Sequence, residues 1–542
     1  MNEEGCVLIG GEARIDVLGA LLSDAALRAP DARFLQLGGA TLTHGELEEQ
    51  ATRLGGALQA VGVRKGDRVA IILPNCIEYV VAIFALAKIG AVQVPINTFL
   101  RGEFLRHQIG ESQASVVIAD ELGIGQLAPI VATLPDLCAV IAVGPCKKSL
   151  PVPIEEYAAL MASGAEAKLP KVTAEDLCNI LYTSGTTGAS KGCMLSHGYY
   201  TWIPEAFVRA GWYGEGDAIF GANPLFHASG QIWIVVTALS CRGEAIVEPA
   251  FSASTFMRRL RETEATVFNG MGAMIAMLLA QPPSPEDRNH RIRQATCVPT
   301  TRETWHAFHD RFGIRLNSEV FGQTEFYPAT ITPAGEPLTP GGAGKVMPHV
   351  ELRIVDDLDR EVPTGEVGEI VMRPRQPRTM FSGYFNNPAA TAQTWRNLWH
   401  HTGDYGRLDE SGTLYFADRK KDSLRRRGEN VSSMELEAAI LTHDAVAAVA
   451  VHAVPSELGE DEIKACIIPK AEAKVSPEEL FSFFKASLPY YAIPRYVEFM
   501  DEFPRNSVNR VQKFKLRELG ITPETLDFEA LGLTVERAER RL

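Results

Sequence analysis

Short apolar runs alternate with amphipathic segments along the first half of the chain. Apolar side chains recur at helical spacing between Leu18 and Leu27, and another helix is expected from Thr43 onward. Apolar runs of strand length recur at 34–37, 69–73, 91–97, 114–119, 139–143, 218–224, 245–248 and 266–269. Continuous apolar runs between polar turns are typical of strands buried in a parallel sheet, and Asn75 is placed to cap the helix after one of them. The pattern predicts sheets covered by helices on both faces.

The pattern changes beyond residue 341. Residues 350–355 and 368–373 alternate polar and apolar positions, which predicts a half-exposed β-subdomain. After a charged stretch at 418–430, apolar segments at 434–441, 446–453, 463–468, 477–487 and 497–500 predict an α+β module of ordinary domain size. We therefore expect an α/β protein with a large N-terminal domain of stacked α/β subdomains plus a β-subdomain over 1–418. A hinge at 419–422 and a small mobile C-terminal α+β domain over 423–542 complete the prediction.

Composition narrows the function classes. The 542 residues carry a net charge of −14, which argues against nucleic acid as a partner because backbone phosphates require clustered basic residues. The chain has no run of about 18 apolar residues and no basic leader at its start, so no membrane partner is expected. The nine cysteines have no metal-ligand spacing and indicate free thiols in a reducing compartment. We expect a cytoplasmic protein, with a homodimer as the default assembly.

The stretch from Tyr182 to Gly192, YTSGTTGASKG, has the composition of an anion-binding loop. Its glycines let backbone N–H groups approach an anion, while hydroxyls and one lysine add donors and charge. It is not a P-loop, because that pattern needs glycine before the lysine and a hydroxyl residue after it, where this chain has Ser190 and Gly192. The predicted phosphate-binding residues are Thr183, Ser184, Gly185, Thr186, Thr187, Gly188 and Lys191.

At this length the stretch resembles the phosphate loop of the adenylate-forming superfamily, which contains acyl-CoA synthetases, adenylation domains and firefly luciferase; Ser190 stands where proline is usual. The resemblance implies a reaction in two steps. A carboxylic acid and Mg·ATP first give an acyl-adenylate and pyrophosphate. CoA then displaces AMP after the small domain rotates. The implied cofactors are CoA and AMP or acyl-adenylate, with ATP and Mg²⁺ where adenylation is retained.

Further motifs carry the same resemblance. In the segment 321–325, Phe321 would stack on adenine, Gly322 belongs to the motif, Thr324 would donate to a phosphate, and Glu325 would hold Mg²⁺. Taken alone, such a segment is equally compatible with a strand-end turn that carries a surface glutamate. The segment 402–404 resembles the ribose-binding motif, with Asp404 as the acceptor for both hydroxyls.

The hinge and the loop after it also match. Arg419 would reach the ribose, and Lys421 would be the pivot of the small domain. Gly428 corresponds to the glycine that lines the pantetheine tunnel in relatives during thioester formation, where a side chain would not fit. His227 matches a position that gates the acyl and thiol sites, although an isolated histidine beside an apolar strand is more often structural.

Two segments depart from the pattern. The family lysine that catalyses adenylation aligns with Arg510, at the end of the segment Pro504–Arg510. A guanidinium is broad and planar where an ammonium is compact, and the loss of one well-aimed donor costs roughly 10²–10³ in rate. The second departure is the bulky segment 295–300, where relatives have small residues along the adenine and acyl pocket. Methionines at 271, 274 and 277 recur with Leu278 at helical spacing, which is more typical of a core than of a substrate pocket.

Within the superfamily, segments 426–432 and 504–506 are similar to the carnitine/crotonobetaine-CoA ligase branch. Our first hypothesis, motivated by Arg510, is a ligase that performs chiefly the second half-reaction on an acyl-adenylate supplied by a separate adenylating enzyme. The alternative is a complete two-step ATP-dependent synthetase in which Arg510 substitutes adequately. A third hypothesis, from another class, is an AMP-binding regulator without turnover. The altered pocket segment favours an acid other than a plain fatty acid.

Overall fold

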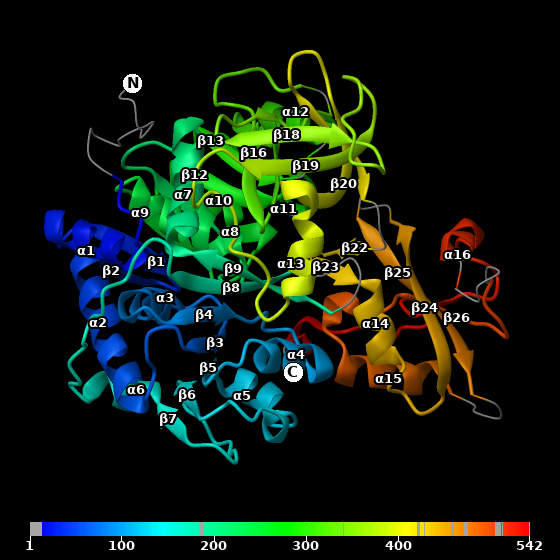
Figure 1. Ribbon diagram of the computed structural model, residues 1–542, viewed down its shortest axis with the longest axis horizontal. Helices are drawn as coiled ribbons and strands as arrows, with labels where there is room; N and C mark the ends of the chain where they lie inside the picture. Colours follow the sequence, from blue (N-terminus) through cyan, green and yellow to red (C-terminus); the bar gives the residue numbers. More distant parts are fainter. Residues whose placement is uncertain are drawn as a thin grey trace.

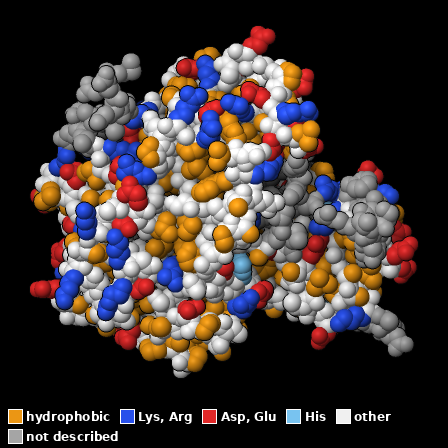
Figure 2. Space-filling view, viewed as in Figure 1, with side chains coloured by type: hydrophobic (Ala, Val, Ile, Leu, Met, Phe, Trp, Pro, Cys, Tyr) orange, Lys and Arg blue, Asp and Glu red, His pale blue; other side chains and the backbone are white. Residues whose placement is uncertain are grey.

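The computed structural model describes most of the chain (Figure 1). The described residues are 14–183, 189–298, 300, 302–339, 341–419, 423–427, 429–456, 460–470, 475–504, 511 and 513–540. They form a large domain of stacked sheets and a smaller C-terminal domain beside it, as the sequence predicts. On the face that Figure 2 shows, acidic and basic side chains are interspersed, with apolar side chains scattered between them.

Two seven-stranded sheets form the large domain. The order β14-β13-β12-β10-β11-β1-β2 joins Arg315–Asn317, Gln294–Val298, Val267–Met271, Ala218–Gly221, Glu244–Val247, Arg33–Leu37 and Ala40–Thr43. The order β7-β6-β5-β3-β4-β8-β9 joins Ile154–Glu156, Ala139–Val143, Val116–Asp120, Arg68–Ile72, Val92–Pro95, Leu177–Thr183 and Lys191–Ser196. Neighbouring strands are parallel except in the pairs β1–β2 and β8–β9. The predicted buried parallel strands are therefore confirmed.

The main core lies between these two sheets. Helix α3 (Ile77–Ile89) is buried from Tyr79 to its end, and a helix that is apolar on all sides belongs in an interior. Helices α1 (Leu18–Arg28), α2 (His44–Val61) and α7 (His197–Arg209) contribute to the same core. The other helices of this region are α4 (Gly102–Glu111), α5 (Glu121–Leu127), α6 (Tyr157–Ala162), α8 (Ala228–Gly230), α9 (Thr237–Ser240), α10 (Ala253–Glu262), α11 (Gly272–Leu279) and α12 (Arg302–Phe312).

The prediction that Asn75 caps the following helix is wrong. The N-cap of α3 is Cys76, which makes no side-chain capping hydrogen bond. The Asn75 amide instead donates to the carbonyl oxygens of Asn223 (3.1 Å) and Glu248 (3.0 Å), and its oxygen accepts from the N–H of Leu225 (2.8 Å). Asn75 thus ties one seven-stranded sheet to the segments that follow β10 and β11 of the other.

The predicted β-subdomain consists of two small sheets. One joins β15 (Val320–Gln323), β16 (Phe326–Ile331) and β17 (Lys345–Val346). The other joins β18 (Val350–Val355), β19 (Gly368–Pro374), β20 (His400–Leu408) and β21 (Leu414–Arg419), with α13 (Pro388–Thr394) between its middle strands in sequence. Figure 1 shows β16, β18, β19 and β20 at the top of the large domain, with β20 nearest to the C-terminal domain.

The C-terminal domain begins with a hairpin and then builds a four-stranded sheet. Its elements are β22 (Ser423–Arg426), β23 (Glu429–Ser432), α14 (Ser433–Ile440), β24 (Val446–Pro455), β25 (Asp461–Pro469), α15 (Pro477–Ser487), β26 (Tyr496–Phe499), α16 (Lys513–Leu519) and β27 (Leu526–Asp527). One face of the sheet packs on α14 and α15, and Phe99 and Phe104 of the large domain reach this core. Leu516 of α16 packs on the opposite face. Figure 1 accordingly shows α16 on the side away from the large domain.

No helix among the described residues combines the length and apolar character needed to cross a bilayer. The domain boundary stays a prediction, because residues 420–422 of the expected hinge lie outside the described part.

Candidate active site

A cavity of about 1820 Å³ lies between the two domains. Six of the residues predicted from sequence line it: Thr183, Lys191, His227, Gly322, Thr324 and Glu325. Phe321 and Asp404 are not among its lining residues. Ser184, Gly185, Thr186, Thr187, Gly188, Lys421, Gly428 and Arg510 lie outside the described residues, and of Arg419 only the backbone is described. The predictions for these residues stay untested.

The two arms of the glycine-rich loop are held by an antiparallel pair. Thr183 ends β8 opposite Lys191, the first residue of β9. The ammonium of Lys191 lies 4.7 Å from the ring centroid of Tyr384, a cation–π contact that fixes the direction of a long side chain. The Tyr384 hydroxyl donates to Glu325 Oε1 at 2.8 Å. Tyr384 therefore joins two predicted site residues, and no sequence motif singles it out.

Glu325 is buried, at 8% exposed. Burial, reinforced by the Glu325 charge, raises the pKa of the Cys193 thiol well above its usual range. Burial lowers the pKa of His400 to about 4, so that imidazole is neutral at physiological pH. The described residues contain no cluster of three metal-ligating side chains. This site suits Mg²⁺, because that ion is commonly held by one carboxylate together with phosphate oxygens and water.

The 321–325 segment and the 402–404 segment meet, although they are far apart in sequence. The Gln323 amide donates to Asp404 Oδ2 at 2.8 Å and to the carbonyl of Thr402 at 2.9 Å. Asp404 is 3% exposed, and its backbone lies opposite that of Arg419 in the antiparallel pair of β20 and β21. The ring of Phe321 is buried and lies 6.3 Å from the ring of Phe416. Two motifs that the sequence gives separately therefore form one wall.

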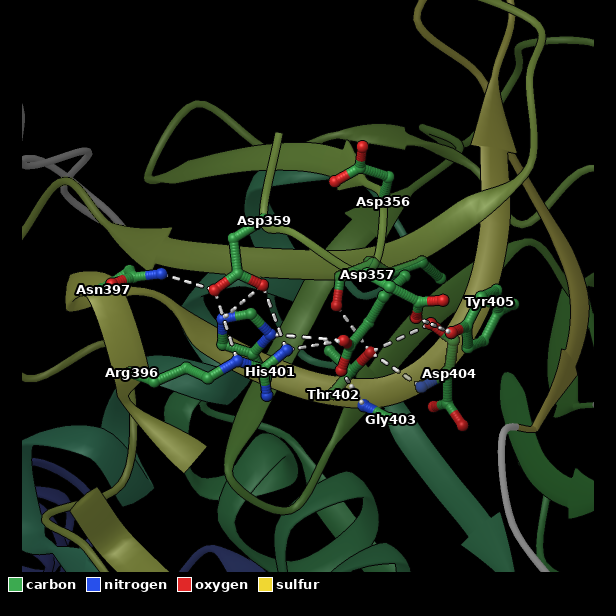
Figure 3. A network of polar contacts seen from close by, with 12 residues as sticks. Asp356, Asp357, Asp359, Arg396, Asn397, His401, Thr402, Gly403, Asp404 and Tyr405 are labelled. Atoms are coloured by element: carbon green, nitrogen blue, oxygen red, sulfur yellow. Dashed lines mark hydrogen bonds and ion pairs between the residues drawn. The ribbon is translucent and has the colours of Figure 1, made fainter. Parts of the chain in front are cut away.

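Beside this wall, and also lining the cavity, is a charged network that sequence reasoning missed (Figure 3). Gly403, at φ +69°, donates its N–H to Glu369 Oε1 at 3.1 Å. Arg396 lies 3.0 Å from the same carboxylate and 3.1 Å from Asp359, and His401 lies 3.3 Å from Glu369. Burial alone would raise the pKa of Glu369, but His401 and Arg396 outweigh it and lower that pKa to about 2. The turn before Asp404 is therefore fixed by an ionised carboxylate.

Contacts from the C-terminal domain cross the cavity at two points. His227 Nε2 lies 3.0 Å from both carboxylate oxygens of Glu429 in the β22–β23 hairpin. Glu435 of α14 accepts from the N–H of Ser190, the residue before Lys191. Burial raises the pKa of Glu435 above its usual range. The hairpin and the start of α14 thus face the large domain's predicted phosphate and gate residues.

The opposite end of the cavity is apolar, and here two predictions need correction. Met271, Met274 and Met277 line the cavity and do not belong to the core. Helix α11 turns Ile275 and Leu278 into the core, so Met274 and Met277, which lie on its other side, face the open space. Met271 ends β12 directly before this helix. In the bulky segment at 295–300, Thr296 and Cys297 are buried within β13 and are not lining residues. Among the described residues, this end of the cavity is therefore lined by α11 and not by that segment.

Comparisons with known proteins agree with this geometry. Residues 22–385 match the model of the AMP-binding enzyme family, and residues 435–510 match the model of the AMP-binding enzyme C-terminal domain. The chain belongs to the AMP-binding enzyme family. It is 32% identical over 489 residues to the crotonobetaine/carnitine-CoA ligase of Shigella sonnei, covering 87% of this chain and 92% of the relative.

Solved structures extend the likeness to both domains. The o-succinylbenzoate-CoA synthetase of Bacillus subtilis, bound with its product analogue, has a TM-score of 0.79 and 25% identity, covering 92% of this chain and 98% of that chain. An anthranilate-CoA ligase in complex with anthranoyl-AMP has a TM-score of 0.70 and 25% identity, covering 94% and 98%. Within its family, this protein is an acyl-CoA ligase of the adenylate-forming type.

Proposed function

We propose that this ligase is specialised for the second half-reaction, in which the acyl group of an acyl-adenylate passes to the thiol of CoA. The observation that carries the proposal is Arg510, which replaces the lysine expected to serve adenylation. The orientation of the C-terminal domain supports it. The hairpin that bears Glu429 contacts His227 beside the cavity, whereas α16, which follows the altered segment, packs on the far face of the sheet.

The described residues have separable tasks in this reaction. Lys191, held over Tyr384, offers positive charge to the phosphate of the AMP ester. Glu369 fixes the turn before Asp404, and Gln323 fixes the carboxylate of Asp404. This carboxylate accepts hydrogen bonds from the ribose hydroxyls. The thiol of CoA gives its proton to water, and its sulfur bonds to the acyl carbon. The bond from that carbon to the phosphate oxygen breaks, and AMP leaves with this oxygen. Mg²⁺, when bound at Glu325, supplies charge neutralisation at phosphates.

The acid itself is expected to be apolar and bulky, because methionines and aromatic side chains shape that end of the cavity. Its adenylate would come from a separate adenylating enzyme, and we expect the reaction in the cytoplasm.

A panel of acids and their synthetic acyl-adenylates tests the proposal. Each acyl-adenylate is supplied with CoA, each free acid is supplied with ATP, Mg²⁺ and CoA, and thioester is measured in both series. The proposal expects thioester from an acyl-adenylate at a rate at least about a hundredfold above the rate from the matching acid. Equal rates would instead favour the complete two-step synthetase. AMP binding with no thioester in either series would favour a regulator without turnover.

A further inference from the structure

The end of the chain returns to the mouth of the cavity, where it brings basic side chains. The tail after α16 runs back between the domains, and Figure 1 shows its end beside α4. Arg537 and Arg540 of this tail line the cavity together with Arg427 and Tyr490. The C-terminal family model ends at residue 510, so these tail residues lie beyond it.

The tail is anchored to both domains. Arg101, at the start of α4, donates to the carbonyl oxygens of Glu539 and Arg540, each at 3.3 Å. Lys485 of α15 pairs with Glu539 at 2.8 Å. Buried Phe528 and half-buried Leu533 pack the preceding segment onto the C-terminal core. These contacts hold the tail in a defined position at the interface.

Two guanidinium groups gather on one aromatic ring at this mouth. The guanidinium carbons of Arg540 and Arg427 lie 4.9 and 5.6 Å from the ring centroid of Tyr490. Like charges brought together repel, and the repulsion is offset when an anion binds between them. Arg427 has one distant carboxylate partner, Glu529, at 3.7 Å.

The remaining polar atoms also point to an anion. Among the described residues, no carboxylate pairs with Arg537 or Arg540, and the Nε atom of Arg540 is buried without a hydrogen-bond partner. A buried donor without a partner is costly, and a guanidinium fork matches phosphate geometry. The chain as a whole carries a net charge of −14, so the positive charge that these arginines place beside the cavity is confined to this region.

We propose that Arg427, Arg537 and Arg540 bind the phosphates of the 3′-phosphoadenosine diphosphate portion of CoA. This inference rests on the proposed function for the identity of the thiol substrate. Arg427 lies at the tip of the hairpin that contacts His227, so a CoA molecule anchored there directs its pantetheine arm along the hairpin into the cavity. The tail is then a CoA-recognition element outside the two family modules.

Direct binding of CoA and of pantetheine, measured by calorimetry on the full chain, tests this site. Pantetheine carries the same thiol without the phosphates. Arg537→Gln and Arg540→Gln should each weaken CoA binding about tenfold, the worth of one charge-assisted hydrogen bond, and leave pantetheine binding unchanged. Arg53→Gln, on the exposed face of α2, is the matched control and should change neither. Arg540→Lys should recover part of the loss because it restores the charge.

The outcomes separate this inference from the proposed function. Equal weakening for CoA and pantetheine, no weakening by either variant, or no CoA binding by the unmodified chain would each overturn the phosphate site. Arg537→Gln guards against a disturbed tail, because Arg537 makes none of the anchoring contacts. If CoA binding depends on the arginines but no acyl-adenylate yields a thioester, the site stands and the proposed half-reaction fails.

Discussion

The large domain and the C-terminal domain differ in how closely they keep the residues that serve the reaction in relatives. In the large domain, the phosphate loop, Glu325 and Asp404 match the expected residue types. In the C-terminal domain, the hairpin facing the cavity is kept, whereas the segment before α16 carries Arg510 in place of lysine. Under the proposed function, the C-terminal domain has lost the chemistry of one face and kept that of the other.

The largest expected effect comes from restoring the missing ammonium. Arg510→Lys should raise pyrophosphate release from ATP and the cognate acid by about 10²–10³, because a compact charge then stabilises the developing charge at the α-phosphate. Thioester formation from a supplied acyl-adenylate should not change. Arg505→Lys, in the same segment, is the control. An unaltered rate of pyrophosphate release would break the comparison between the two domains.

The cavity-facing contact should behave in the opposite way. Glu429→Ala removes the carboxylate that pairs with His227 and should lower thioester formation from an acyl-adenylate by about ten- to a hundredfold. Glu429→Gln keeps an acceptor and should lose less. Exposed Glu524→Ala is the matched control. A loss of AMP binding as large as the loss of thioester formation would show that this contact does not serve domain closure.

Within the large domain, Glu369 should carry stability. The pKa of Glu369 is lowered from 4.5 to about 2, which corresponds to a contribution of at most about 3 kcal/mol to the free energy of unfolding. We expect about 2 kcal/mol, because Glu369 lines an open cavity in which water screens its charge. A depressed carboxyl pKa stabilises the fold above pH 4.5, and this contribution is lost as the pH falls towards 2. Glu369→Gln should therefore lower the free energy of unfolding at pH 7.

Urea unfolding at pH 7 and at pH 3 checks this expectation. The difference between the Glu369→Gln variant and the unmodified chain should shrink at the lower pH, since at pH 3 the carboxyl is mostly protonated in the unfolded chain and still mostly ionised in the folded chain. Exposed Glu361→Gln is the control, because its ion pair with Arg353 is long and hydrated. If the difference in the free energy of unfolding did not change with pH, the effect of the substitution would come from packing and not from charge.

Much of the fold could be predicted because local patterns and tertiary structure agree. Strand β6 and helix α15 have the predicted limits, and Thr43 begins α2 with a complete capping box. The cap at Asn75 was wrong because partners in another sheet compete for the same amide. A capping preference contributes about 1 kcal/mol, so several tertiary hydrogen bonds outweigh it.

The candidate site was predictable only where its residues form contiguous motifs. Tyr384 contacts Glu325, and Glu369 contacts the turn at Gly403, only because the fold brings distant segments together. No local sequence pattern predicts such contacts. The histidine pair before Thr402 was an available signal, since adjacent histidines in a strand beside a predicted site are uncommon core residues. The prediction that Met271, Met274 and Met277 belong to a core is wrong because helical periodicity identifies an apolar face but does not distinguish a core from a cavity.

The smallest expected effect concerns the second contact between the domains. Burial raises the pKa of Glu435 in the closed arrangement, so closure is fully favoured below pH 4.5 and weakens as the pH rises through the raised pKa. Glu435→Gln stays neutral and still accepts from the Ser190 N–H. The ratio of the variant's rate of thioester formation to that of the unmodified chain should therefore rise with pH, by less than about tenfold. Exposed Glu478→Gln should give a constant ratio, and a constant ratio for Glu435→Gln as well would mean that this carboxyl does not limit closure.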